Sequence, residues 1–331
     1  MDSPNLTGVP SSPLLDYTGA AGDGARIEAA LHAAVRTTDP YLDELASHLI
    51  VAGGKRLRPV LTVVAAQVAG GPGSDDAVQG GIACELVQTG SLYHDDVIDE
   101  SYSRRGVETV NAKWGNLQAI LAGDFLLSRA SEIAASLGAE VAGLLARTIG
   151  RLCEGEIEQL RHTYNSARPE SSYLSSIGGK TAALFATAAR IGGIVAGLER
   201  PQIEALTDFG NSYGMVFQIV DDILDVTSTE EVLGKPVGHD LVEGVYTLPV
   251  LRTLQAGGVA AAELLALLGK PLEPAERDKA LEIVRANRGV ASARSTAMEW
   301  ADQAAAHVAA LPDTPATAAL RGASHALLAD I

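Results

Sequence analysis

The chain has 331 residues, enough for one large domain or two small ones, and 47% of them are hydrophobic, which is ample for a sizeable core. Its formal net charge of −16 leaves it without the basic footprint that a nucleic-acid-binding protein needs, so we expect no nucleic-acid partner. Ala and Leu dominate and aromatic residues make up only 4%, a composition that favours helices.

The first part of the chain differs from the rest. Residues 1–24 are rich in Gly, Pro, Ser and Asp, which predicts a disordered N-terminal tail. They show neither the basic segment nor the apolar core of a signal peptide, and no later apolar run is long enough to span a membrane. We therefore expect a cytoplasmic protein, with room for a transient membrane contact through an apolar product. Cys84 and Cys153 lie in apolar periodic segments, which predicts buried thiols of a reducing compartment.

Residues 25–331 show helical periodicity and no convincing alternating strand. Gly and Pro, as in Gly53-Gly54 and Arg200-Pro201, mark the joints between segments. We interpret this region as one all-α domain, an antiparallel helical bundle that the Ala-rich C-terminal part completes. The expected helices are 25–36, 40–52, 56–69, 75–100, 116–137, 139–164, 171–197, 201–228, 245–255, 259–268, 274–286 and 290–310.

A first acidic cluster stands in the stretch LYHDDVIDES. Asp95 and Asp99 are four residues apart, so on a helix they share one face and lie one turn from each other, with Asp96 beside them. A single DDxxD also has a simpler interpretation, because a solvated helix end often carries several acids.

A second copy makes the simpler interpretation less attractive. Asp221, Asp222 and Asp225 interrupt an apolar stretch, QIVDDILDV, that should be largely buried. Unpaired buried carboxylates are costly, so the acids need a partner. Carboxylate oxygens without His or Cys favour a hard ion such as Mg²⁺ or Mn²⁺, and Mg²⁺ commonly keeps positions for phosphate oxygens. The two clusters together predict a metal-bridged polyphosphate site.

Basic residues that could bind such a phosphate recur along the chain. Lys binds phosphate as a point charge and Arg binds it with two parallel hydrogen bonds. The alternative, scattered surface bases, is plausible for Arg56 and least plausible for Lys180, which sits in an apolar helix. The candidates are Lys55, Arg56 and Arg58 in GGKRLRP, Arg104 and Arg105, Lys180 with Thr181 in GGKTA, and Lys235 in LGKP.

The order of these motifs resembles the trans-isoprenyl diphosphate synthases. The motifs are GGKRLRP, ELVQTGSLYHDDVIDES, RRG, GDF, GEIEQ, GGKTA and FQIVDDILD, and they cover roughly residues 50–250. The resemblance implies an all-α bundle around a deep central cavity, usually as a homodimer. It also implies Mg²⁺-dependent condensation of isopentenyl diphosphate onto an allylic diphosphate, with no dedicated side-chain base.

The resemblance implies a role for each matching residue. Thr181 and Gln218 would line the reacting centre. The Mg²⁺ ligands would be Asp95, Asp96, Asp99, Asp221, Asp222 and Asp225. The allylic diphosphate would be held by Arg104, Lys180 and Lys235, and isopentenyl diphosphate by Lys55, Arg58 and Arg105.

Three positions bear on these roles. Gln88 stands where the family commonly has a His that contacts isopentenyl diphosphate, and Gln can donate a hydrogen bond but carries no charge. Val245 stands where the family often has a Lys for the allylic diphosphate. His94, next to Asp95, is expected to be a hydrogen-bonding residue behind the metal site rather than a ligand.

Product length is expected to depend on the helix before Asp95. Short-chain members of the family have a bulky aromatic residue near the positions of Gly90 and Ser91, which are both small here. This predicts a deep pocket and a medium or long all-trans polyprenyl product. Alternatively, the small residues serve only close helix packing, with Phe125, Leu126 or Leu127 as the pocket floor.

Other functions remain open at this point. A class I terpene cyclase would use the same metal site but no second diphosphate, and Gln88 is the feature that leans toward it. A synthase of farnesyl or geranylgeranyl length is a further alternative, although DDVID lacks the two-residue insertion of the bacterial farnesyl-type pattern. A non-catalytic partner subunit would be expected to lose its acidic motifs, and a metal-stabilised helical scaffold would not explain the accompanying bases.

Overall fold

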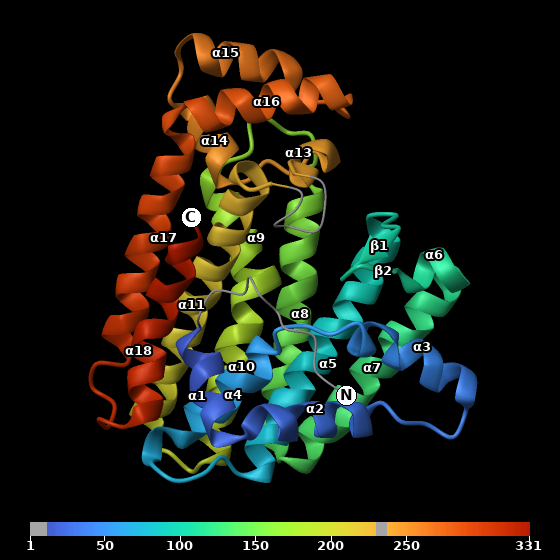
Figure 1. Ribbon diagram of the computed structural model, residues 1–331, viewed down its shortest axis with the longest axis vertical. Coiled ribbons are helices and arrows are strands. Elements are labelled where there is room, and N and C mark those ends of the chain that lie inside the picture. The colour runs from blue at the N-terminus through green and yellow to red at the C-terminus, as the bar shows by residue number, and fades with distance from the viewer. Residues whose placement is uncertain (1–11, 230–236) are drawn as a thin grey trace.

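The computed structural model describes residues 12–229 and 237–331, and this part of the chain is almost entirely helical (Figure 1). It confirms the all-α class. The elements are α1 Pro13–Ala21, α2 Asp23–Ala34, α3 Pro40–Val51, α4 Leu57–Ala66, the 3₁₀ turn η1 Gln67–Ala69, α5 Asp75–Ile98, β1 Ser103–Arg104, β2 Val107–Glu108, α6 Val110–Trp114, α7 Asn116–Ser136, α8 Ala139–Leu160, α9 Glu170–Ile177, the π-helical turn η2 Gly178–Ala182, α10 Ala183–Val195, α11 Arg200–Thr227, α13 His239–Glu243, α14 Leu248–Gln255, α15 Gly258–Leu267, α16 Pro274–Ala286, α17 Arg288–His307, α18 Pro315–Leu327 and η3 Leu328–Asp330.

The long helix α11 connects the two hydrophobic clusters that form the core. Its first half contributes Leu206, Phe209 and Tyr213 to a cluster shared with α1–α5, α7, α8 and α10. Its second half, including Ile219 and Ile223, joins a cluster built with α9 and α14–α17. In Figure 1 the long helices run along the long axis of the molecule, and α15 and α16 lie across their upper end. The second acidic cluster therefore belongs to a helix that contributes buried residues to both parts of the core.

The prediction of a disordered N-terminal tail is wrong for the second half of that segment. Pro13–Ala21 forms α1, which packs against α4 and α18, and Leu14 is completely buried. Asp23 is buried as well, where it pairs with Arg26 and accepts a hydrogen bond from Gln67. The partners of this segment lie far away in sequence, so its composition alone did not reveal them. Residues 1–11 lie outside the described part of the chain.

Other boundaries also differ from the prediction. A two-stranded antiparallel hairpin, β1–β2, interrupts the helical pattern, and the expected helix 171–197 contains the π-helical turn η2. The structure adds the short α6 and α13 and the unpredicted α18, whose N-cap Thr314 accepts a hydrogen bond from the Thr317 amide. Cys84 is buried as expected, but Cys153 is exposed. Across residues 12–229 and 237–331, every helix is too short or too polar to be a candidate membrane span.

Candidate active site

The π-helical turn η2 is the geometric centre of the site. It lies between α8 and α11, and glycines allow it to approach α8 closely. A Cβ atom on Gly155 of α8 would lie 2.5 Å from the Lys180 amide nitrogen, and one on Gly179 would lie 2.8 Å from the Arg151 carbonyl oxygen. Single π-helical turns occur frequently at functional sites. Here the turn presents Lys180 to the first acidic cluster and the neighbouring Thr181 to the second.

Lys180 forms an ion pair with an acid that was not predicted. Its Nζ lies 2.5 Å from Oε2 of Glu156 on α8. Burial disfavours the charged ammonium, but the charges of Asp95, Glu156 and Asp99 outweigh it, so the pKa of Lys180 is raised. Burial raises the pKa of Asp95, although Lys180 opposes the shift. The carboxyl of Asp99, at the exposed end of α5, is still partly desolvated, and this effect together with Glu243 raises its pKa to about 6.

Asp96 has a different environment from Asp95 and Asp99. It is only 1% exposed, and Nε of Arg104 on β1 donates a hydrogen bond to its Oδ1 at 2.6 Å. Its other oxygen, Oδ2, is buried and accepts no hydrogen bond from the described residues. The hairpin that follows α5 returns Arg104 to the helix that carries Asp96.

The second cluster is held by neutral donors. Thr181 Oγ1 donates to Gln218 Oε1 at 2.7 Å, and Gln218 Nε2 donates to Asp222 Oδ1 at 2.8 Å. The hydroxyl of Tyr173 donates to Asp222 Oδ2 at 2.5 Å, so both oxygens of this 3%-exposed carboxylate are bonded. Burial nevertheless raises the pKa of Asp222 to about 7, opposed by these two bonds.

The other two acids of the second cluster differ in exposure. Asp225 is buried, and its Oδ2 accepts a hydrogen bond from the Asp240 amide at 3.3 Å. Asp221 is exposed, which leaves its carboxylate accessible from solvent.

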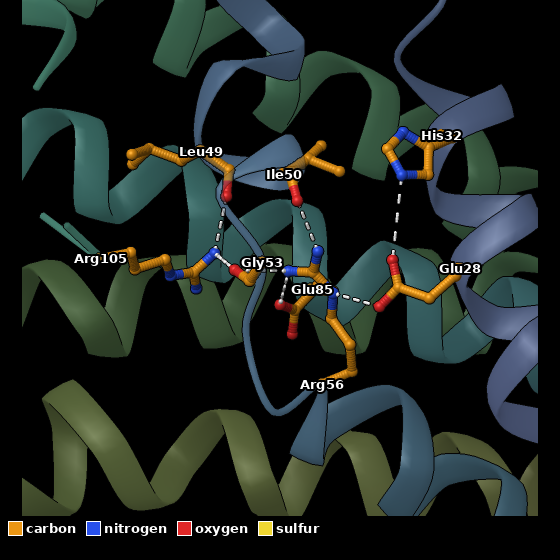
Figure 2. Close-up of polar contacts among 8 residues, drawn as sticks. All are labelled: Glu28, His32, Leu49, Ile50, Gly53, Arg56, Glu85 and Arg105. Carbon is orange, nitrogen blue, oxygen red and sulfur yellow. Dashed lines mark hydrogen bonds and ion pairs between the residues drawn. The ribbon is translucent and has the colours of Figure 1, made fainter. Parts of the chain in front are cut away.

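The predicted cations for isopentenyl diphosphate surround the start of α4. Lys55 is exposed, and Arg58 is half-buried with its guanidinium 4.3 Å from the centre of the Phe185 ring. Burial lowers the pKa of Arg58 to about 10, which leaves it protonated at neutral pH. Arg105 donates from Nη1 to the carbonyl oxygens of Leu49, at 2.8 Å, and Gly53 (Figure 2). Gln88 is half-buried on α5, and Lys235 lies outside the described residues.

Arg56 does not have the surface position that was thought plausible for it. It is 6% exposed, and Nε donates to Glu28 at 2.8 Å while Nη1 donates to Glu85 at 3.2 Å. Nη2 also donates to the Ile50 carbonyl oxygen at 2.7 Å. Figure 2 shows the guanidinium enclosed by these groups, which come from α2, α5 and the end of α3.

The predicted length-determining residues lie near α7. A Cβ atom on Gly90 would lie 3.0 Å from the Gly123 carbonyl oxygen, so this position favours the close-packing alternative. Ser91 is half-buried, and its hydroxyl donates to the Gln88 carbonyl oxygen. His94 also faces α7, with Nε2 3.2 Å from the Ile120 carbonyl oxygen and 3.4 Å from Asp124.

Two pockets of the structure do not test whether the predicted deep central cavity exists. One, of about 360 Å³, lies beside Gly155 and Gly179, and another, of about 680 Å³, lies between residues 166–169 and α14–α15. Neither contains an Asp of the two clusters, so the deep central cavity stays a prediction.

Sequence reasoning missed Glu156, Tyr173 and Glu85. Glu156 belongs to the motif GEIEQ, so a signal for it existed even though its partner was unknown. Glu85 likewise begins the motif ELVQTGSLYHDDVIDES, whereas Tyr173 had no distinctive spacing, and only the structure reveals that they contact Arg56 and Asp222.

The donor set fits a hard divalent cation. The acids of both clusters offer carboxylate oxygens, which are hard ligands, and burial raises the pKa values of Asp95 and Asp99, so that their charged forms would gain from a nearby cation. No three His, Cys, Asp or Glu side chains among the described residues form a ready-made metal cage. Mg²⁺ commonly takes only one or two carboxylates together with phosphate oxygens, so a preformed cage is not required.

Comparison with known proteins gives one consistent result. The polyprenyl synthetase family model matches residues 39–285. A nonaprenyl diphosphate synthase of Mycobacterium tuberculosis is 40% identical over 297 residues, 89% of this chain and 89% of the relative. Component 2 of a heptaprenyl diphosphate synthase of Geobacillus stearothermophilus is 40% identical over 306 residues, 92% of this chain and 95% of the relative. A polyprenyl synthase of Caulobacter crescentus, solved with calcium and isoprenyl diphosphate, superposes with a TM-score of 0.89 at 34% identity, covering 96% of both chains.

Proposed function

Because the chain belongs to the polyprenyl synthetase family, we propose that it condenses isopentenyl diphosphate repeatedly onto an allylic diphosphate to give a medium or long all-trans prenyl diphosphate. It is a prenyltransferase. The observation that carries the proposal is the π-helical turn η2. Its Lys180 pairs with Glu156 and is influenced by the charges of Asp95 and Asp99, while the adjacent Thr181 is bonded to Gln218, which in turn donates to Asp222. One turn of backbone thereby ties both clusters to a single reacting centre.

We assign the metal to the accessible acids. Asp95, Asp99 and Asp221 would hold Mg²⁺, with Mn²⁺ as a substitute, while Asp96 and Asp222 are occupied by Arg104 and by Tyr173 with Gln218. When bound, the metal supplies positive charge that stabilises the diphosphate as it leaves the allylic carbon. Related synthases were solved with calcium and isoprenyl diphosphate, which supports a divalent cation at such a site.

The protein's own residues act on the two substrates in different ways. Lys180, whose raised pKa keeps it charged, and Arg104 would bind the departing allylic diphosphate, with Lys235 as a further predicted contact. Lys55, Arg58 and Arg105, with Gln88 in place of a cation, would bind the diphosphate of isopentenyl diphosphate. Thr181 and Gln218, bonded to each other, would border the reacting carbons. The released diphosphate would accept the proton, so no side-chain base is required.

The assembly and the product length extend the proposal. Leu117, Ile120 and Leu121 of α7 are 65%, 41% and 56% exposed, which supports an apolar contact with a second copy in a homodimer. Ser91→Phe should shorten the product, whereas a bulky residue at Gly90 should disturb the packing of α5 on α7. Unchanged product length in the folded Ser91→Phe variant would refute the pocket placement.

The direct test is incubation of the purified protein with Mg²⁺, radiolabelled isopentenyl diphosphate and farnesyl or geranylgeranyl diphosphate, followed by dephosphorylation and chromatography. A ladder of labelled prenyl alcohols that ends at a long chain supports the proposal. Consumption of the primer without label incorporation, with release of a hydrocarbon or terpene alcohol, would replace it with a terpene cyclase.

A further inference from the structure

A buried carboxylate lies directly beneath the cations assigned to isopentenyl diphosphate. Glu85 is 3% exposed and belongs to α5, three residues before Gln88, so the two side chains lie on the same face of the helix one turn apart. Its negative charge is felt by both Arg58 and Arg105. An uncompensated carboxylate here would oppose a dianionic or trianionic ligand, and it would also attract the arginines away from that ligand.

Arg56 forms an ion pair with this carboxylate. Its Nη1 lies 3.2 Å from Glu85 Oε1, and its Nε and Nη2 are bonded to Glu28 and to the Ile50 carbonyl oxygen. Figure 2 shows Arg56 and Arg105 reaching the Gly53 carbonyl oxygen from opposite sides, with Glu85 on the Arg56 side. The guanidinium that faces Glu85 is therefore the buried one, and the Arg58 and Arg105 guanidiniums are not ion-paired to Glu85.

The backbone of Arg56 adds a second, independent feature. With φ 49° and ψ 36° it adopts the left-handed conformation, which is uncommon for a residue with a side chain. Arg56 is also the N-cap residue of α4, so this conformation turns the chain between Lys55, just before it, and Arg58, in the first turn of the helix. Strained residues of this kind persist where the surroundings fix them, and the buried contacts of Arg56 provide that fixation.

We infer that Arg56 is a positioning residue for the second substrate: it neutralises Glu85 and fixes the turn, so that Lys55, Arg58 and Arg105 present their positive charge to the diphosphate. The inference rests on the proposed function for the identity of that diphosphate. Arg56 itself is buried beneath the site and does not contact the ligand. The allylic site depends on Lys180 and the acids of α5 and α11, so it should not respond to Arg56.

The test is a double-mutant cycle of Arg56 and Glu85, in which the affinity for isopentenyl diphosphate is measured. Isothermal titration of isopentenyl diphosphate in Mg²⁺ is carried out on the wild type and on Arg56→Gln, Glu85→Gln and the double variant, with thermal melts to confirm folding. Arg56→Gln should weaken binding about tenfold, and Glu85→Gln on the same chain should restore it to within about threefold of the wild type. Glu28→Gln, which removes the more exposed partner of Arg56, is the matched control and should change the affinity less than about twofold. KM for the allylic substrate should stay unchanged in all variants.

Two results would overturn the inference. Arg56→Gln could bind isopentenyl diphosphate as tightly as the wild type, or the folded double variant could bind as weakly as Arg56→Gln, which would mean that Arg56 contributes only structure. The proposed function fails separately, if the wild type binds isopentenyl diphosphate but incorporates no label; the binding cycle then still decides the role of Arg56. A wild type that does not bind the ligand contradicts both.

Discussion

The two DDxxD clusters have the same spacing in sequence but are supported by different chemistry. On α5, the buried acid is Asp96, and a cation, Arg104, holds it. On α11, the corresponding acid is Asp222, and two neutral donors, Tyr173 and Gln218, hold it. In both clusters the first acid, Asp95 or Asp221, is not engaged in these pairs.

This difference has a consequence for how each cluster responds to charge. Burial raises the pKa of Asp96 as well, but the permanent positive charge of Arg104 opposes this shift. Asp222 has hydrogen bonds but no ion pair among the described residues, and burial raises its pKa to about 7. A repeated motif therefore does not imply repeated electrostatics, because the partners come from elsewhere in the fold.

The largest effect is expected from removing the divalent cation that both clusters require. Chelation of divalent cations by excess EDTA should reduce label incorporation to background, because the carboxylates cannot bind the diphosphate without a bridging cation. Readdition of Mg²⁺ should restore activity. Full activity of the chelated, metal-free protein would contradict the assignment of the acids.

The next prediction separates accessible acids from supporting ones. Asp95→Asn and Asp221→Asn should each lower kcat by about 10²–10³, in the range seen when one transition-state stabilising group is removed. Asp96→Asn, which loses an ion pair with Arg104 but no metal ligand, should have a smaller effect on kcat. Steady-state kinetics at saturating Mg²⁺ measures all three, and equal losses would remove the distinction.

Tyr173 tests the neutral support of the second cluster. Tyr173→Phe deletes the donor to Asp222 Oδ2, which should cost about 1–3 kcal/mol of the free energy of unfolding and lower kcat. Tyr246→Phe is the matched control, because this buried hydroxyl instead accepts a hydrogen bond from the Gly269 amide. It should cost stability without lowering kcat. Urea unfolding and steady-state kinetics check both variants, and equal kcat values would refute the role of Tyr173.

The smallest expected effect is a pH dependence of the free energy of unfolding of the metal-free protein. A folded-state pKa of about 7 for Asp222 lies above its unfolded value, so the folded state binds this proton more tightly. Its contribution to stability is fully present below the unfolded pKa and is lost as pH rises toward 7. The slope cannot exceed about 1.4 kcal/mol per pH unit for one proton. Asp222→Asn should flatten the dependence, measured by urea unfolding from pH 4 to 7; an unchanged slope would contradict the assignment.

The sequence was informative wherever one segment carried the whole signal. The periodicity predicted α5 and α11 and the acids on them, and the apolar neighbours of Lys180 argued against a scattered surface base; its side chain is 30% exposed and pairs with Glu156. It failed where the partner lies far away in the chain. Leu14 is buried against helices that follow much later, which composition cannot indicate. Arg56 resembles any surface base until α2 and α5 bring Glu28 and Glu85 to it. The backbone of the π-helical turn lies close to Gly155, and the hydrophobic periodicity of the sequence does not indicate such a turn.

The most direct measurement of the central comparison is a crystal structure with Mn²⁺ and an unreactive allylic diphosphate analogue, with the metal located by anomalous scattering. We expect manganese bound by Asp95, Asp99 and Asp221, with Asp96 still paired to Arg104 and Asp222 still bonded to Tyr173 and Gln218. Manganese coordinated directly by Asp96 or Asp222, or a diphosphate held without any metal between it and the acids, would contradict it.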